Sequence, residues 1–132
     1  MNGTTIRRTL GLGTGMVALT ATLLSGTAHA DPSRANISVG SGNYWGVVCA
    51  QRAINAMHYE NTAWYHEVAE DGVFGSDTYN GVRSFQHYMN YHRNQNLVID
   101  GIVGPATGDD VVYMARHWNA SSNCYPYVPT TY

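Results

Sequence analysis

The sequence predicts an all-α fold, a compact three-helix bundle built around a turn that occurs twice. Residues 71–78 read Asp-Gly-Val-Phe-Gly-Ser-Asp-Thr, and the pattern returns at residues 100–107 as Asp-Gly-Ile-Val-Gly-Pro-Ala-Thr. A repeat of this kind indicates a duplicated supersecondary unit. Apolar residues also recur with helical spacing in three separate stretches, whereas nothing in the chain supports a full sheet. Three short helices around one apolar centre satisfy both observations.

Each copy of the repeat reads as a tight turn that leads into a helix. The glycine after the aspartate permits a left-handed backbone, and the second glycine stands just before the helix. Pro105 suits a first helical position because its missing N–H needs no partner there. An aspartate before glycine in a turn normally accepts backbone N–H bonds. The predicted structural turn residues are Asp71, Gly72, Gly75, Asp100, Gly101 and Gly104.

The three helices follow from apolar stripes with 3.6-residue periodicity. The first stripe consists of Val47, Ala50, Ile54 and Met57. The second helix is expected over about residues 76–91 and the third over about 105–118, with a buried stripe of Val111, Met114, Ala115 and Trp118. Residues 58–70 form a polar and aromatic connector, residues 92–96 a polar break, and residues 120–132 a tail. Phe74 and Phe85 are also expected in the core.

The chain begins with an export signal. Arg7 and Arg8 precede a largely apolar run at residues 10–24, and Ala28-His29-Ala30 fits a small-x-small cleavage site. The arginine pair leaves open general secretion or a twin-arginine route. We therefore expect a signal peptide over residues 1–30, a flexible leader over 31–43 and one domain over 44–132. The apolar run is too short for a persuasive membrane span, so no span is expected in the mature form.

Composition restricts the partners of the mature chain. Two of the seven basic residues, Arg7 and Arg8, lie in the signal peptide, and the remainder are outnumbered by nine carboxylates. Nucleic-acid binding normally needs a basic face, and so does adhesion to anionic lipid. Cys49 and Cys124 are the only cysteines, and in an exported chain they are expected to form a disulfide. Two free thiols, or a metal held by the pair, remain the alternatives.

No group of residues has the pattern of a catalytic or metal site. Asp71 and Asp100 have the residue type of a glycosidase carboxylate pair, but their turn role explains both positions. The mature histidines lack the i, i+3 or i+4 spacing of a helical metal site and are expected to face solvent: His58, His66, His87, His92 and His117. We accordingly predict no catalytic residues, no metal and no cofactor.

The chain resembles the small three-helix peptidoglycan-binding domain of bacterial cell-wall hydrolases. The family's opening helix matches at Val47, Gln51, Ile54 and Asn55. Its first turn and helix match at Asp71, Gly72, Phe74, Gly75, Thr78, Val82, Phe85 and Gln86. Its closing unit matches at Leu97, Asp100, Gly101, Val103, Gly104, Pro105 and Thr107. The chain departs from the family in its longer connectors and in Gly108, where the family usually has tryptophan. The resemblance implies an all-α fold and wall binding by a stand-alone secreted form.

Aromatic residues are the best candidates for ligand contacts. The ten tyrosines and three tryptophans all lie after residue 30 and exceed what a small core needs. Aromatic faces stack on sugar rings, and tyrosine adds a hydrogen bond. Some of these side chains are expected to cover the edge of the core or to pack under the tail. The predicted ligand-binding residues are Trp64, Tyr65, Tyr88 and Tyr91.

These observations lead to one main functional hypothesis and two alternatives. The main hypothesis is a secreted, cell-wall-associated and non-catalytic protein whose partner is peptidoglycan. The first alternative is a secreted protein-binding module or inhibitor that acts on an extracellular enzyme or surface partner, which the extra aromatic surface and long connectors would serve. A small cell-wall hydrolase is the weaker alternative.

Overall fold

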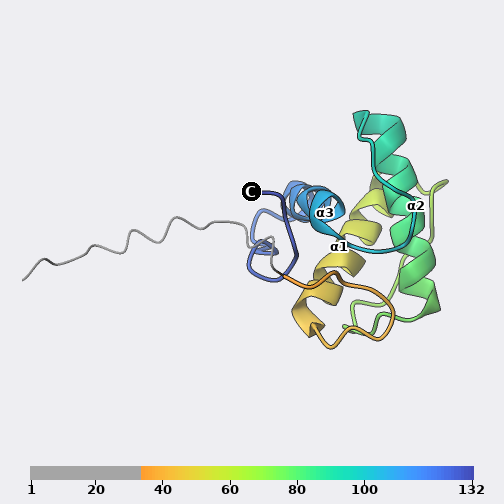
Figure 1. The fold of residues 1–132 in the computed structure, drawn as a ribbon. Helices are drawn as coiled ribbons and strands as arrows, with labels where there is room; N and C mark the ends of the chain where they lie inside the picture. The colour runs from red at the N-terminus through yellow and green to blue at the C-terminus, as the bar shows by residue number, and fades with distance from the viewer. Residues whose placement is uncertain (1–33) are drawn as a thin grey trace, which may run out of the picture.

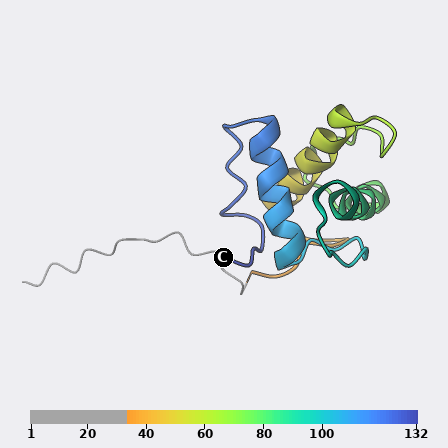
Figure 2. The same ribbon diagram turned by 90° about the horizontal axis from the view of Figure 1, so that it is seen from above.

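The structure, a computed structural model, describes residues 34–132 and contains three helices, α1 (Tyr44–Glu60), α2 (Ser76–Arg93) and α3 (Pro105–Trp118). Helix α1 packs against both of the others. In Figure 1, α3 is seen nearly along its axis and α2 from the side, whereas in Figure 2, α3 is seen from the side and α2 nearly along its axis. The axes of α2 and α3 are therefore steeply inclined to each other. Within the described residues the only β-structure is one isolated bridge. The predicted all-α, three-helix fold is confirmed.

The helix boundaries have local causes. The side-chain oxygen of Asn43 accepts a hydrogen bond from the Gly46 N–H at 3.0 Å and so caps the start of α1. Helix α2 runs to Arg93 rather than ending near Tyr91, and the left-handed Asn94 (φ 53°) ends it. Helix α3 begins at Pro105, as the preference of proline for the first turn predicts.

The core gathers the predicted apolar stripes, with one exception. Val47, Ile54, Phe85 and Met114 are all buried. Trp118, expected in the stripe of α3, is instead 53 % exposed, so that prediction is wrong. In this last turn of α3 the indole ring lies outside the core and stacks on Tyr59, with ring centroids 4.7 Å apart and planes 6° apart.

The segment before α1 packs on the domain from residue 37 onward, against the expectation of a flexible leader. Ile37 is fully buried and exchanges backbone hydrogen bonds of 3.0 and 2.9 Å with Val103. The Gly40 N–H donates to the Phe74 carbonyl at 3.2 Å. Because Phe74 and Val103 occupy the same place in the two repeats, this segment joins both turns. The predicted signal peptide, and residues 31–33 of the leader, lie outside the described residues.

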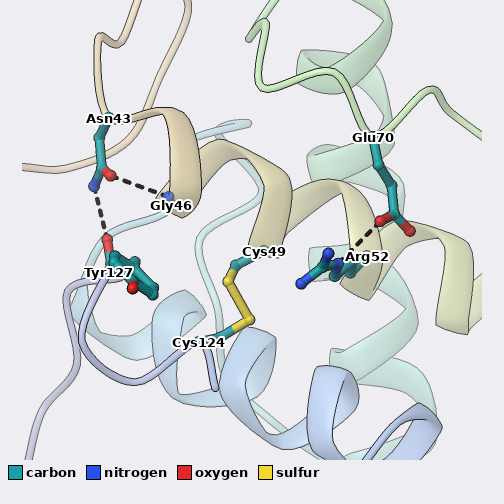
Figure 3. The surroundings of a disulfide bond; sticks show 7 residues. All are labelled: Asn43, Gly46, Cys49, Arg52, Glu70, Cys124 and Tyr127. Carbon is teal, nitrogen blue, oxygen red and sulfur yellow. Dashed lines mark hydrogen bonds and ion pairs between the residues drawn. A yellow bond between two sulfur atoms is a disulfide. The ribbon is translucent and has the colours of Figure 1, made fainter. Parts of the chain in front are cut away.

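The tail is fastened across α1 and α3. The predicted Cys49–Cys124 disulfide is present, with Cα atoms 5.7 Å apart (Figure 3). Its closure of a long loop is worth about 4 kcal/mol in the chain-entropy account. Further along, a Cβ added to Gly108 would lie 1.7 Å from the Pro129 carbonyl oxygen. The tail therefore packs directly on the α3 backbone at the position where the resembling family usually carries tryptophan.

Candidate functional site

A buried glutamine on α1 organises the first turn. Gln51 is 1 % exposed, and its amide nitrogen donates to the Asp71 carboxylate at 2.8 Å, to the Val73 carbonyl at 3.2 Å and to the Thr78 hydroxyl at 3.2 Å. Its amide oxygen accepts the Gly72 N–H at 3.0 Å. One buried side chain thus forms hydrogen bonds with polar groups along the whole turn.

A glutamine on α2 does the same for the second turn. Gln86 donates to the Asp100 carboxylate at 2.9 Å, to the Ile102 carbonyl at 3.0 Å and to the Thr107 hydroxyl at 3.2 Å, and it accepts the Gly101 N–H at 2.9 Å. Gly72 and Gly101 have φ values of +70° and +74°. The same hydrogen-bonding pattern therefore occurs in both turns, and in each turn the glutamine comes from the preceding helix.

An asparagine one turn later fastens each connector. Asn55 exchanges two hydrogen bonds with the Val68 backbone, at 3.0 and 2.8 Å. Asn90 does the same with Leu97, at 2.9 and 2.7 Å. We call Gln51, Asn55, Val68 and residues 71–78 the first turn unit, and Gln86, Asn90, Leu97 and residues 100–107 the second turn unit. The asparagine and its partner are 13 residues apart in the first unit and 7 in the second.

The two turn aspartates are occupied by their own turns. The Asp71 carboxylate accepts the Val73 N–H at 2.9 Å, and this bond, followed by the one from Gln51, lowers the pKa of Asp71 below its usual value. The Asp100 carboxylate accepts the Ile102 N–H at 2.9 Å. A carboxylate with a lowered pKa stays ionised at neutral pH, which is the state of a turn acceptor and opposite to that of a general acid.

The long connector of the first unit brings three of the four predicted ligand residues together. Trp64 lies 5.4 Å from Tyr88 and 5.8 Å from Tyr91, measured between ring centroids. His87 and His92 complete the group, at 5.1 and 5.5 Å from Trp64. We call these five residues the connector aromatic cluster. The Ser84 hydroxyl on α2 fixes its position by donating to the Trp64 carbonyl at 2.6 Å.

Within this cluster Tyr91, His87 and His92 are exposed, Trp64 is half-buried and Tyr88 is buried. Tyr91 is 74 % exposed and Trp64 is partly buried against the core. Tyr88 is only 6 % exposed, and its hydroxyl donates to Glu60 at 2.5 Å. Burial first, and then this bond, raises the pKa of Tyr88 to about 12. Tyr88 therefore supports the other rings from beneath.

Tyr65, the fourth predicted ligand residue, lies apart from the cluster. Its hydroxyl donates to the Asp77 carboxylate at 3.0 Å, and its ring stacks on His66 and packs against the core. Burial, followed by the bond to Asp77, raises the pKa of Tyr65 to about 12. These contacts tie the connector to the start of α2.

A second aromatic surface escaped the sequence analysis. Tyr59 and Trp118, the stacked pair, are 48 % and 53 % exposed. Beside Trp118 lies an open depression of about 340 Å³ lined by Arg52, Glu70, Ala115, Trp118, Asn119, Ser121 and Ser122. No local sequence pattern predicts this surface, because α1, the connector, α3 and the tail each contribute residues to it. We call the depression the tail pocket.

Two of the histidines lie beside carboxylates. His66 lies 2.8 Å from the Asp77 carboxylate, and His117 lies 3.4 Å from that of Glu60. The described part of the chain contains no group of three His, Cys, Asp or Glu side chains placed to hold a metal ion. None of the helices in residues 34–132 combines the length and apolar character that crossing a membrane requires.

Comparison with protein families identifies the region that contains both turn units. Residues 46–109 match the family described as "Putative peptidoglycan binding domain". The match begins within α1 and ends within α3, and therefore leaves the tail outside it. No curated protein and no solved structure matches the chain.

Proposed function

We propose that the protein is a secreted, non-catalytic protein that binds cell-wall peptidoglycan, because residues 46–109 match the peptidoglycan-binding family. The observation that carries the proposal is the extent of the match, which includes both turn units rather than a single motif. The export signal expected at residues 1–30 supports an extracellular location.

The connector aromatic cluster is the proposed contact surface for the wall. Tyr91 is exposed and Trp64 is half-buried, and both lie beside the exposed His92. Such rings combine apolar stacking with polar edges. The mature chain carries more carboxylates than basic residues, so stacking and hydrogen bonding, rather than attraction of charges, would supply the affinity. Binding of this kind persists at moderate salt, because screening acts on exposed charges.

The proposed lack of catalysis rests on the positions of the carboxylates. Asp71 and Asp100 accept hydrogen bonds from the backbones of their own turns and from Gln51 and Gln86. A general acid must hold a proton until it transfers it to the substrate, whereas the lowered pKa of Asp71 keeps that carboxylate ionised at neutral pH. Both aspartates hold the fold that presents the aromatic surfaces.

Co-sedimentation with insoluble peptidoglycan tests the proposal. The purified protein should pellet with sacculi and release no soluble wall fragments. Combined Trp64→Ala and Tyr91→Ala substitutions should weaken binding about tenfold, the equivalent of roughly 1.4 kcal/mol of stacking. Trp45→Ala is the matched control, because Trp45 is 52 % exposed and makes its ring contacts with Tyr44 and Tyr127.

Three results would contradict parts of the proposal. Release of wall fragments would disprove the non-catalytic role and favour a small hydrolase. Full retention by the double variant would move the contact surface away from the connector aromatic cluster. If the protein pellets with no wall preparation, the secreted protein-binding alternative replaces wall binding.

A further inference from the structure

The tail pocket has the composition of a ligand site although most of its lining lies outside the family match. Ala115, Trp118, Asn119, Ser121 and Ser122 all follow residue 109, where the match ends. The Cys49–Cys124 disulfide fastens the tail next to them. The end of α3 and the tethered tail therefore form most of the pocket.

The charges in the pocket compensate each other. The Arg52 Nε donates to the Glu70 carboxylate at 2.9 Å, and the two side chains are 37 % and 39 % exposed (Figure 3). Figure 3 shows this pair one turn of α1 away from the disulfide. A guanidinium has five N–H donors, and a carboxylate has about four acceptor sites, of which Glu70 uses one for Arg52 and one for Asn55 at 3.4 Å. The pair therefore offers hydrogen bonds without offering net charge.

The aromatic wall of the pocket is already in place. Tyr59 stacks on Trp118, and the Tyr59 hydroxyl donates to Glu67 at 2.8 Å, which holds the outer ring of the pair. Although Tyr59 covers part of it, Trp118 remains 53 % exposed. A fixed ring requires little ordering when a ligand binds, so more of the stacking energy remains as affinity.

We propose that the tail pocket binds a neutral, hydroxyl-rich sugar, and specifically an N-acetylated sugar of the glycan strand rather than the stem peptide. The indole of Trp118 stacks on the ring of the sugar. The exposed Asn119 and Ser121 and the Arg52–Glu70 pair bind its hydroxyl and acetamido groups. A free carboxylate or ammonium of a peptide would find each pocket charge already paired. The volume of about 340 Å³ lies at the small end of ligand sites, about 300–1,000 Å³.

This inference rests on the proposed wall-binding function, and a titration separates the two. An oligomer of N-acetylglucosamine is added to the ¹⁵N-labelled protein while amide and side-chain N–H signals are followed by NMR. We expect shifts at the Trp118 indole, the Arg52 Nε–H and the backbone of residues 119–122. Trp118→Ala should weaken the oligomer affinity about tenfold, while Trp45→Ala leaves it unchanged. An unaltered thermal midpoint for Trp118→Ala confirms that the variant is folded.

Each outcome bears on one of the two claims. Oligomer-induced shifts confined to the pocket support the inference, even if intact sacculi fail to retain the protein, which would contradict the proposed function alone. Retention on sacculi without pocket shifts overturns the inference and leaves wall binding standing. If a synthetic stem peptide, and not the oligomer, shifts the pocket signals, the pocket is a peptide site and the inference is wrong.

Discussion

The two turn units have nearly the same hydrogen-bond distances but connectors of different length. Their glutamine-to-threonine distances are both 3.2 Å, and their glutamine-to-aspartate distances are 2.8 and 2.9 Å. The connectors differ, because the asparagine and its partner are 13 residues apart in the first unit and 7 in the second. The bonds that hold the turn do not depend on the length of the intervening chain.

The longer connector carries the residues that the shorter one lacks. Trp64, Tyr65 and His66 all lie in it. Asn55 binds the backbone of Val68, and Gln51 binds the backbone of Gly72. The connector residues before Val68 are therefore constrained mainly by the need to leave no buried backbone group without a partner. A rigid frame with one extended connector is the usual arrangement for presenting ligand contacts.

Removing the glutamines should break both units, with the largest effect on stability. Gln86→Leu takes away the partner of the Gly101 N–H, the Ile102 carbonyl and the Thr107 hydroxyl. Gln51→Leu takes away the partner of the Gly72 N–H, whereas the Thr78 hydroxyl still donates to the Val73 carbonyl at 3.2 Å. We expect Gln86→Leu to lower the free energy of unfolding by about 3–5 kcal/mol and Gln51→Leu by about 2–4 kcal/mol. Urea denaturation measures both.

Gln95→Leu is the matched control, since Gln95 is partly exposed and lies after the end of α2. It should change stability by less than about 0.5 kcal/mol. A large loss for one turn glutamine and none for the other would show that the two units are alike in geometry but not in energy.

Substituting the left-handed glycines should reveal a smaller difference between the units. Alanine at either position must adopt a positive φ, and its Cβ would lie 2.4 Å from the Tyr79 ring at Gly101 and 2.2 Å from the Tyr44 ring at Gly72. Tyr44 is 50 % exposed and has room to turn outward, whereas Tyr79 packs against the core. We expect a loss of about 2–3 kcal/mol for Gly101→Ala and about 1–2 kcal/mol for Gly72→Ala.

Thermal or urea unfolding of the two alanine variants measures this order. Equal losses would mean that backbone strain alone sets the effect. A larger loss at Gly72 would show that the Tyr44 ring is held more firmly than its exposure indicates.

Local patterns were sufficient to predict most of the fold. The helices follow from apolar periodicity and the turns from Asp-Gly chemistry, both of which act over a few residues. The roles of Gln51 and Gln86 were missed because each reaches a turn 20 or 14 positions away, measured to the aspartate. A signal was present, since Gln-x-x-x-Asn occurs at residues 51–55 and again at 86–90.

The predictions that the structure corrects concern residues whose positions depend on tertiary contacts. The burial of Ile37 depends on one backbone pairing with Val103, which composition cannot reveal in a Ser/Gly-rich segment. Trp64 and Tyr65 are neighbours, yet they contact different parts of α2, Tyr91 and Asp77. Tertiary packing sets the orientation of side chains in a connector. Residue type and position in the sequence therefore predicted the members of the connector aromatic cluster only in part.

The helices that follow the two turns carry different residues at several buried positions. One of these differences should respond to pH, with the smallest expected effect. The residue three places after the threonine is Gly81 in α2 and Asp110 in α3. A Cβ at Gly81 would lie 2.8 Å from the Ile54 Cδ1. Asp110 is 5 % exposed, and burial raises its pKa to about 6, against the opposing effect of Arg93 and with a further increase from Asp109.

The sign of the pH dependence follows from this raised pKa. Between pH 4 and 6 the folded state holds a proton at Asp110 that the unfolded state has lost, so this group lowers stability as pH rises through that window. Above about pH 6 the buried charge costs roughly 1–2 kcal/mol. Asp110→Asn should therefore increase stability at pH 7.5 by about that amount and change it little at pH 4. Urea denaturation at both values checks this, and a variant that loses the same stability at each pH would show that the Asp110 carboxyl acts through packing rather than through its charge.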